Sequence, residues 1–251
     1  MIVDPPVLAV SGASKRFGAV VALAGVDLSV RRGEVLAILG DNGAGKSTLI
    51  KCLSGVERLD EGTIELDGVP VSIRTPVDAR RLGIETVFQD FALFDSLSAA
   101  DNFYAGRELG RPGWMPRTLR LIDRRRMTET MRATFRRMHV SLDHEGEVGL
   151  MSGGQRQAVA VSRAAAFASK LVVLDEPTAA LGVRAARAVL DLILRLREEG
   201  KAVLVVSHAM DHVMEVADRA IILRRARKVG EVVPSSETYD EMISLMVGGD
   251  A

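Results

Sequence analysis

The sequence predicts an α/β protein whose centre is a mainly parallel β-sheet. Three apolar runs are continuous rather than alternating: "GEVLAILG" (33–40), "KLVVLDE" (170–176) and "KAVLVVSH" (201–208). Continuous Val, Leu and Ile residues are typical of parallel strands that helices cover on both faces. A segment able to form a helix follows each run. Because ligands bind at the carboxyl ends of such strands, we expect the functional site where these three runs end.

Two other segments, "GTIELDG" (62–68) and "RAIILRRARKVGEVV" (219–233), are predicted to form antiparallel strands. From about residue 91 to residue 168 the strand pattern is absent, which favours helices. One of them, "DRRRMTETMRATFRRM", places four apolar side chains on one helical face, and we interpret this stripe as core. The four side chains are those of Met127, Met131, Phe135 and Met138.

The stretch from Arg107 to Arg126 carries seven arginines but only two acidic residues. We predict a solvated loop there, with contact to lipid headgroups as the alternative. His139 and His144 are interpreted as surface residues. The single cysteine, Cys52, leaves no intrachain disulfide to form and is predicted to be buried.

Composition narrows the classes of function. The chain has 251 residues, and its 33 Lys and Arg residues balance its 33 Asp and Glu residues. This balance argues against general nucleic-acid binding, which relies on a basic surface. The N-terminal "MIVDPPVLAV" lacks the features of a signal peptide, and charged residues interrupt every apolar stretch before the length of a membrane span. We therefore expect a cytosolic protein that reaches a membrane only through a partner or its surface.

A phosphate-binding loop follows the first apolar run. The segment "GDNGAGKST" matches the pattern G-x-x-x-x-G-K-[ST] between a predicted strand and a predicted helix. Its glycines let backbone N–H groups surround phosphate oxygens, its lysine reaches the β- and γ-phosphates, and its serine hydroxyl binds Mg²⁺. The residues are Gly40, Asp41, Asn42, Gly43, Ala44, Gly45, Lys46, Ser47 and Thr48.

The other two strand ends carry the remaining parts of a nucleotidase. Asp175 is suited to hold Mg²⁺ through water, and Glu176 is suited to activate the attacking water as general base. The alternative is that both acids only cap the next helix. His208 ends the third run, where an imidazole can contact a γ-phosphate. His212 stands four residues later, but no third metal ligand accompanies this pair.

Two further segments carry polar groups suited to a nucleotide. Gln89, in "TVFQDF", ends another predicted strand, and its amide can reach Mg²⁺ or the water. "MSGGQRQ" (151–157) stands before a predicted helix at 155–168, whose N-terminus would attract an anion. One chain would then contain two phosphate-binding segments.

In this order and spacing, "GDNGAGKST", "VFQD", "MSGGQRQ", "LDEPTAAL" and "VSHAM" resemble the ATP-binding subunit of ABC transporters. The segments "RRLGIETVFQDFALFDSLSAADNFYAGREL" and "DEPTAALGVRAARAVLDLI" are most similar to bacterial importers of ribose, xylose and fructose. The resemblance implies one ABC ATPase domain over 1–251. Its RecA-like core with an antiparallel β subdomain would span 1–90 and 167–251, and its helical lobe 91–166.

The resemblance also implies roles for particular residues. ATP and Mg²⁺ would be the cofactors, Phe17 would stack on adenine, and Gln89 would report the nucleotide state to the membrane subunit. The segment 90–102 would touch that subunit's coupling helix. In a head-to-tail homodimer, "SGGQ" of one chain would close over the γ-phosphate bound by the other chain. Those four residues are Ser152, Gly153, Gly154 and Gln155.

Two positions depart from the family pattern. Met151 stands where leucine is usual, and Gly182 stands where an aspartate commonly contacts the opposing subunit. The first is a near-isosteric change that should matter little. The monosaccharide importers look similar at the second, so we do not interpret it as decay.

The resemblance thus predicts an ATPase that powers import of a small solute, a monosaccharide. The homodimer would sit on the inner face of the membrane under integral permease subunits, served indirectly by an extracytoplasmic solute-binding protein. Three alternatives remain: a soluble ABC-type ATPase in DNA repair or translation, a small-molecule kinase, and a regulator that no longer hydrolyses ATP. The kinase would not explain "MSGGQ", and the regulator would not need Lys46, Asp175, Glu176 and His208.

Overall fold

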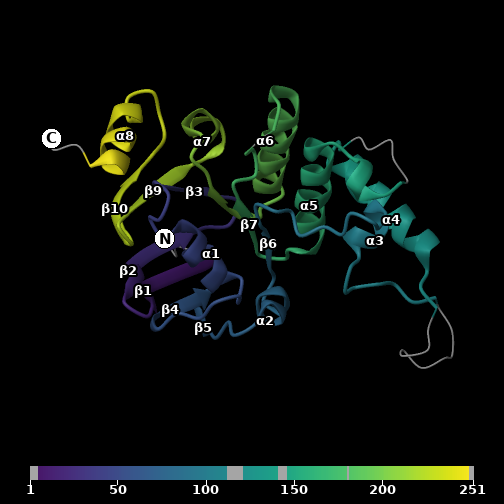
Figure 1. Ribbon diagram of the computed structural model, residues 1–251, viewed down its shortest axis with the longest axis horizontal. Helices are drawn as coiled ribbons and strands as arrows, with labels where there is room; N and C mark the ends of the chain where they lie inside the picture. Colours follow the sequence, from purple (N-terminus) through teal and green to yellow (C-terminus); the bar gives the residue numbers. More distant parts are fainter. Residues whose placement is uncertain (1–4, 112–120, 141–145, 180, 249–251) are drawn as a thin grey trace.

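A computed structural model describes residues 5–111, 121–140, 146–179 and 181–248 of the chain. Within them, two β-sheets pack beside a group of helices (Figure 1). His144 and the centre of the arginine-rich stretch, residues 112–120, lie outside the described residues.

Both sheets contain segments from distant parts of the chain. The smaller sheet is antiparallel and has the order β2 (Val20–Val30), β1 (Leu8–Phe17), β4 (Glu61–Leu66), β5 (Val69–Val71). The larger sheet has the order β10 (Arg227–Val232), β9 (Arg219–Arg224), β3 (Val35–Leu39), β8 (Ala202–Val206), β7 (Leu171–Asp175), β6 (Ile84–Val87). The three apolar runs therefore form β3, β7 and β8, as predicted, and they are neighbours.

The segment 219–233 differs from its prediction. It forms two strands, and only β10 is antiparallel to its neighbour, because β9 pairs with β3 in parallel. The signal for this arrangement was present in the sequence. Ala220 to Leu223 are apolar without interruption and fully buried, as in the other parallel strands of the sheet.

The helices fall into a shorter and a longer group. The shorter ones are α1 (Lys46–Leu53), α2 (Pro76–Arg81), α3 (Ala99–Phe103), α7 (Met210–Val216) and α8 (Tyr239–Val247). The longer ones are α4 (Arg124–Arg137), α5 (Gly153–Phe167) and α6 (Val183–Glu198). A 3₁₀ turn, Val148–Leu150, precedes α5.

Alternate residues of the parallel strands face different helices. Val173 of β7 packs in the cluster that contains Leu49 of α1, whereas Val172 packs in the cluster that contains Ala164 of α5. Side chains of successive strand residues point to opposite faces of a sheet. Helices α1 and α5 therefore cover opposite faces of the larger sheet, a separation that matters for the two phosphate-binding segments.

The predicted apolar stripe of α4 is buried as expected, but it serves two cores. Met127, Met131 and Phe135 pack with Phe103 of α3 in a separate helical cluster. Met138, beyond the C-terminus of α4, packs instead in the cluster that α5 and α6 form on the sheet. Helix α4 is thus attached to the sheet through its C-terminal end.

The prediction of a solvated arginine-rich loop is wrong at Arg107. Its guanidinium forms an ion pair with Glu85 of β6 and lies 4.5 Å from the ring centroid of Phe167. Arginine favours such a site because its planar group stacks on aromatic rings while it pairs with a carboxylate.

Cys52 is buried as predicted, and burial raises the pKa of its thiol to about 11. Among the described residues, no helix has the length and apolar character of a membrane span.

Candidate functional site

Four strands of the larger sheet end beside one another at its carboxyl edge. In spatial order these are β3, β8, β7 and β6, and the polar residues predicted for the site directly follow them. Two backbone hydrogen bonds continue the ladder past the strands: Ser207 N donates to Ile38 O at 3.3 Å, and Glu176 N donates to Val206 O at 2.9 Å. The predicted residues thus share one edge because the order of the strands places them there.

The phosphate loop is held in shape by close backbone packing. Gly40 has φ +148°, and a Cβ there would lie 2.2 Å from Leu223 O of β9. Gly45 has φ +110°, and its Cβ would lie 2.6 Å from Ala22 O of β2. Sterics therefore require both glycines. Of the rest of the loop, Ala44 is buried, Thr48 is half-buried, and Asp41, Asn42, Gly43 and Ser47 are exposed.

Lys46 begins α1 at the mouth of this loop. Its ammonium group is buried and donates to the carbonyl oxygens of Gly40, at 2.6 Å, and of Asp41, at 3.0 Å. These contacts keep the charge above the loop, where it can reach phosphate oxygens. A cation in this position also acts on the neighbouring carboxylates.

Asp175 and Glu176 stand side by side at the end of β7. Asp175 is buried, and burial raises the pKa of its carboxyl; the adjacent Glu176 raises the same pKa further, while Lys46 lowers it. Two carboxylates this close repel each other unless a cation lies between them. The Asp175 carboxylate, the Ser47 hydroxyl and the Gln89 amide are hard oxygen donors of the kind that Mg²⁺ prefers.

Glu176 is paired with the predicted histidine. Its Oε2 lies 2.6 Å from Nδ1 of His208. Glu176 also has φ +52°, which is uncommon for a residue with a side chain. Such backbone conformations concentrate at functional sites. Glu176 and His208 are thus brought together, and their joint role in hydrolysis stays a prediction.

Gln89 follows β6 at the same edge of the larger sheet, whereas Phe17 lies on the smaller sheet; among the described residues neither side chain has a hydrogen bond to the strand-end residues. Gln89 is exposed two residues beyond Val87, which pairs with Leu174 of β7, so it emerges at the same edge as Asp175. Phe17 ends β1 on the other sheet and is partly exposed, with Lys15 Nζ 5.3 Å from its ring centroid. An exposed aromatic ring of this kind offers a surface for stacking.

The "SGGQ" segment forms the N-terminus of α5 through a capping box. Gln155 N donates to Ser152 Oγ at 3.3 Å, and Ser152 N donates to Gln155 Oε1 at 2.9 Å. Its second glycine has a packing role, since a Cβ on Gly154 would lie 2.4 Å from Cβ of Ala185 on α6. A Cβ on Gly153 would meet only ordinary contact distances. Of the two glycines, Gly153 is therefore the one that the packing leaves free for a ligand.

Two contacts at the site were not predicted. Thr178 Oγ1 and His212 Nδ1 lie 2.9 Å apart, which ties the loop after Glu176 to α7 and gives His212 a structural role. Ala226, in the turn between β9 and β10, donates from its N–H to Ala44 O at 3.2 Å and accepts from Ala24 N at 2.8 Å. Ala226 has φ +68°, a conformation that alanine rarely adopts, so nothing in the sequence indicated this turn.

The comparisons with known proteins agree with this geometry. The protein-family model "ABC transporter" matches residues 23–179, more than half of the chain. The chain belongs to the ABC transporter family. As the ATP-binding subunit of such a transporter, it is an ATPase.

Two curated relatives extend over nearly the whole chain. A "Fructose import ATP-binding protein FrcA" from Rhizobium meliloti is 46% identical over 245 residues, which cover 97% of this chain and 94% of the relative. A "Ribose import ATP-binding protein RbsA 1" from Rubrobacter xylanophilus is 41% identical and covers 97% of this chain. The matched residues make up only 47% of the ribose protein, so the chain spans about half of that relative's length.

Solved structures show the same ABC cassette fold. A nucleotide-free ATP-binding cassette from an ABC transporter has a TM-score of 0.80 at 26% identity and covers 98% of this chain and 96% of its own. A dimeric post-hydrolysis cassette bound to ADP and Pi, MJ0796, has a TM-score of 0.73 at 26% identity, with 91% and 99% covered.

The two departures from the ABC pattern are accommodated without distortion. Met151 is buried in the helical cluster with Phe103, where a flexible side chain of leucine's size fits. Gly182 is the N-cap residue of α6 with φ −67°, and a Cβ there would meet nothing within 4 Å. The backbone at this position therefore does not require glycine.

Proposed function

We propose that this ABC ATPase powers the import of a monosaccharide. The proposal is carried by the similarity to the fructose import protein, which is 46% identical over nearly the full length of both chains. A "Xylose/arabinose import ATP-binding protein XylG" from Sulfolobus acidocaldarius, 39% identical over 92% of this chain, supports the same class of solute. The family match carries the ATPase activity, and the names of these relatives support the proposed direction of transport and the proposed solute.

Hydrolysis would depend on the residues at the carboxyl edge of the larger sheet. Lys46 would bind the β- and γ-phosphates, and Glu176 would accept the proton of the attacking water. His208, 2.6 Å from Glu176, would orient that carboxylate and contact the γ-phosphate. Phe17 would stack on the adenine, while Thr48 and the other residues of the phosphate loop would contact the phosphates.

Mg²⁺ fits the oxygen donors of Ser47, Asp175 and Gln89. When bound, it would neutralise charge on the β- and γ-phosphates. Burial raises the pKa of the Asp175 carboxyl, and Mg²⁺ binding would have to overcome this shift because the metal binds the carboxylate form. Lys46 opposes that shift, so the lysine supports the metal site as well as the phosphates.

Two copies of the chain would form a head-to-tail dimer with two shared sites. The phosphate loop precedes α1 and "SGGQ" begins α5, and these helices cover opposite faces of the larger sheet. A second copy can supply its "SGGQ" to the phosphate loop of the first. This would explain why one chain has two phosphate-binding segments, and a solved dimeric ABC cassette, 23% identical to this chain, is consistent with pairing.

The dimer would lie on the cytoplasmic face of the membrane beneath integral permease subunits. An extracytoplasmic binding protein would deliver the sugar to them. Within the chain, residues 1–90 and 167–251 would form the ATP-binding core and 91–166 the lobe that faces the partner copy. The segment 90–102 would contact the permease.

Affinity purification of the tagged chain from native membranes tests the proposal. Recovery of a polytopic permease, together with a binding protein that binds a monosaccharide, is the expected result. Recovery of ribosomes or DNA-repair proteins without a permease would favour the alternative of a soluble ABC-type ATPase. Assay of the recovered binding protein against ribose, xylose and fructose then identifies the solute.

A further inference from the structure

Helix α4 has an exposed face that is strongly cationic. The helix carries six arginines and one acidic residue, Glu129, and all seven side chains are exposed. The arginines are Arg124, Arg125, Arg126, Arg132, Arg136 and Arg137. The apolar residues of α4 point the other way, into the helical cluster that contains Phe103. None of the residues proposed for ATP binding or hydrolysis lies on this helix.

Ion pairs neutralise only part of this face. Three of its arginines have acidic neighbours: Arg124 with Asp101 at 3.7 Å, Arg125 with Glu129 at 2.9 Å, and Arg137 with Glu199 at 3.5 Å. Within the described part of the chain, the side chains of Arg126 and Arg136 have no hydrogen bond or ion pair. Exposed pairs of this kind are weak, so the face keeps an excess of positive charge.

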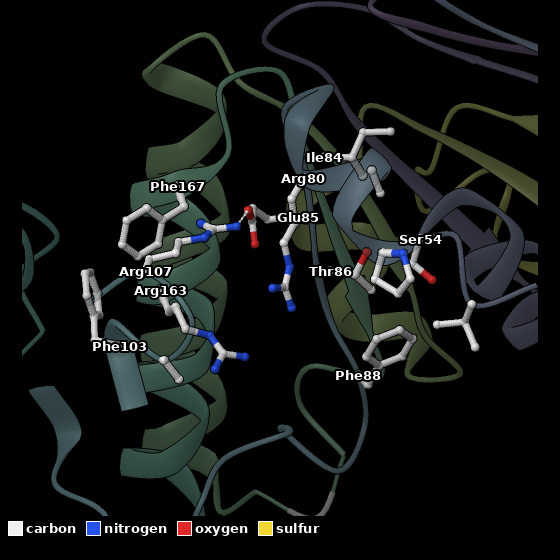
Figure 2. A pocket seen from close by; sticks show the side chains of 14 residues that line it. Ser54, Arg80, Ile84, Glu85, Thr86, Phe88, Phe103, Arg107, Arg163 and Phe167 are labelled. Atoms are coloured by element: carbon white, nitrogen blue, oxygen red, sulfur yellow. Dashed lines mark hydrogen bonds and ion pairs between the residues drawn. The ribbon is translucent and has the colours of Figure 1, made fainter. Parts of the chain in front are cut away.

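Not every arginine of this region belongs to that face. Arg107, at the start of the arginine-rich stretch, forms an ion pair with Glu85 and lies over the ring of Phe167. Figure 2 shows its guanidinium directed to Glu85. The charge of Arg107 is therefore neutralised within the fold, whereas the arginines of α4 are presented to the outside.

Two exposed aliphatic side chains stand directly before α4. Leu121 is 62% exposed and Ile122 is 46% exposed. Backbone hydrogen bonds hold them in place, because Arg111 N donates to Leu121 O at 2.8 Å and Asp123 N donates to Leu109 O at 2.7 Å. We define Leu121, Ile122 and the exposed arginines of α4 as the α4 surface. Cationic side chains beside exposed aliphatic ones are typical of surfaces that bind membranes.

The α4 surface begins next to α3. Arg124 Nε lies 3.7 Å from Asp101 Oδ1, and Figure 1 shows α3 and α4 together at the end of the molecule opposite α8. Asp101 belongs to the segment 90–102, which the proposed function places against the permease. The N-terminal end of α4 would then lie close to the bilayer that surrounds the permease. This step rests on the proposed function, whereas the charge and exposure of the surface do not.

We propose that the α4 surface binds a bilayer that contains anionic phospholipids. The guanidinium groups would donate to headgroup phosphates, and Leu121 and Ile122 would enter the headgroup region. Each arginine close to an anionic bilayer raises partitioning about fivefold. Nucleic acid is another polyanion, but it has no use for exposed aliphatic side chains, and the chain as a whole has no net charge.

Vesicle flotation of the purified full chain tests this surface. Vesicles of phosphatidylcholine alone are compared with vesicles that also contain about 30% phosphatidylglycerol, each at low salt and in about 0.5 M sodium chloride. We expect the chain to bind the anionic vesicles about tenfold or more tightly than the neutral ones, and the high salt to release it. No permease is present, so the result does not depend on the proposed function.

Paired substitutions locate the charge that is responsible. Arg126→Gln with Arg136→Gln should weaken binding to the anionic vesicles about tenfold or more, because two unpaired charges are lost. The control, Arg31→Gln with Arg58→Gln, removes the same charge from exposed arginines outside the helical lobe and should bind as wild type does. Arg126→Lys with Arg136→Lys should retain most of the binding, since the attraction is mainly electrostatic.

The aliphatic contribution has its own matched control. Leu121→Ser should weaken vesicle binding several-fold, whereas Val69→Ser, on β5, should leave it unchanged. The two side chains are almost equally exposed, at 62% and 61%. Circular dichroism of each variant, with an unfolding midpoint near that of wild type, shows that lost binding does not come from lost structure.

Selective, salt-sensitive binding that the α4 variants lose and the controls keep would support the proposal. Absence of binding to the anionic vesicles at low salt, equal binding to neutral vesicles, or an equal loss in the Arg31 and Arg58 control would overturn it. Binding of a mixed-sequence DNA duplex through the same arginines, without vesicle binding, would assign the surface to nucleic acid instead. Recovery of a permease tests the proposed function separately, so either can fail while the other stands.

Discussion

At the scale of single residues, we propose that hydrolysis depends on Glu176 more than on any other carboxylate. Its backbone is in the left-handed region, and its side chain lies 2.6 Å from His208. Asp175, by contrast, is buried. The adjacent acids therefore have different environments, which is how neighbouring carboxylates acquire different roles.

Glu176→Gln should leave ATP binding intact and slow hydrolysis by about two to four orders of magnitude, because only the general base is lost. The variant should accumulate as an ATP-stabilised dimer on gel filtration, while the apparent Kd for ATP stays within a few-fold of wild type. Glu198→Gln, at the end of α6, is the matched control. Normal turnover by Glu176→Gln would remove Glu176 from the role of base.

At the scale of elements, α5 packs closely on α6, and the two glycines of "SGGQ" differ in how much this packing restricts them. Gly154→Ala would place a Cβ 2.4 Å from Cβ of Ala185, and overpacking of this kind costs about 1–3 kcal/mol. Gly153→Ala meets a contact of 3.7 Å and should change the free energy of unfolding by less than about 1 kcal/mol.

Urea unfolding of both variants, followed by circular dichroism, measures this difference. We expect Gly154→Ala to lower the midpoint clearly and Gly153→Ala to leave it near wild type. Equal stabilities would contradict the packing role of Gly154. ATPase activity of Gly153→Ala then reports on phosphate binding without a change in stability.

The segment 90–102 is a second element with a separable role. Asp95 is exposed, and its carboxylate lies 3.5 Å from Arg156 of α5, while Gly149 N donates to Asp95 O at 2.9 Å. The segment is thus exposed at Asp95 and also contacts Gly149, in the turn before "SGGQ". An exposed ion pair of this kind contributes little to stability, about 0–1 kcal/mol.

Asp95→Arg should therefore reduce sugar uptake in reconstituted vesicles several-fold, while the basal ATPase of the isolated subunit stays near normal. Arg156→Asp breaks the same ion pair by changing its other member. The double variant Asp95→Arg with Arg156→Asp restores a pair of opposite charges with their positions exchanged. Recovery of sugar uptake in the double variant would mean that uptake depends on the ion pair, whereas continued loss would mean that it depends on the negative charge at position 95. Equal losses of transport and basal activity would mean that the segment shapes the ATP site instead.

At the scale of the whole molecule, the question is which chain completes each ATP site. Lys46→Ala damages the phosphate loop, and Ser152→Arg blocks "SGGQ" by its bulk. Each homodimer should be inactive. In a mixed dimer of the two variants, suppose that "SGGQ" acts across chains. One site then combines the damaged loop of one chain with the blocked "SGGQ" of the other, and the second site combines two intact halves. The mixed dimer should therefore recover one whole site.

ATP trapping per dimer, measured beside turnover, is the test, since cooperativity can silence a single whole site. Trapping should appear in the mixed dimer and be absent when wild type is paired with the double variant. The reverse pattern would show that each chain completes its own site. Tagging the two chains differently allows the mixed dimers to be isolated.

Much of the fold and of the site was predictable because the signals are local. Continuous apolar runs define β3, β7 and β8, and the glycine, carboxylate and histidine residues directly follow them. Any parallel arrangement of these strands places their carboxyl ends at one edge. The motifs "GDNGAGKST" and "LDEPT" therefore predicted that their residues meet at one edge of the sheet, although the sequence alone could not order the strands.

The sequence by itself determined the chemistry, that of an ATPase of the ABC family, since each motif carries its reactive groups within a few residues. Only the tertiary structure decided which residues serve packing: Gly154 against Ala185, Ala226 against Ala44, and Arg107 against Glu85. These partners lie about 20 to 180 residues apart in the chain. Such contacts form between faces of different elements, and no local pattern of side chains specifies the opposite face.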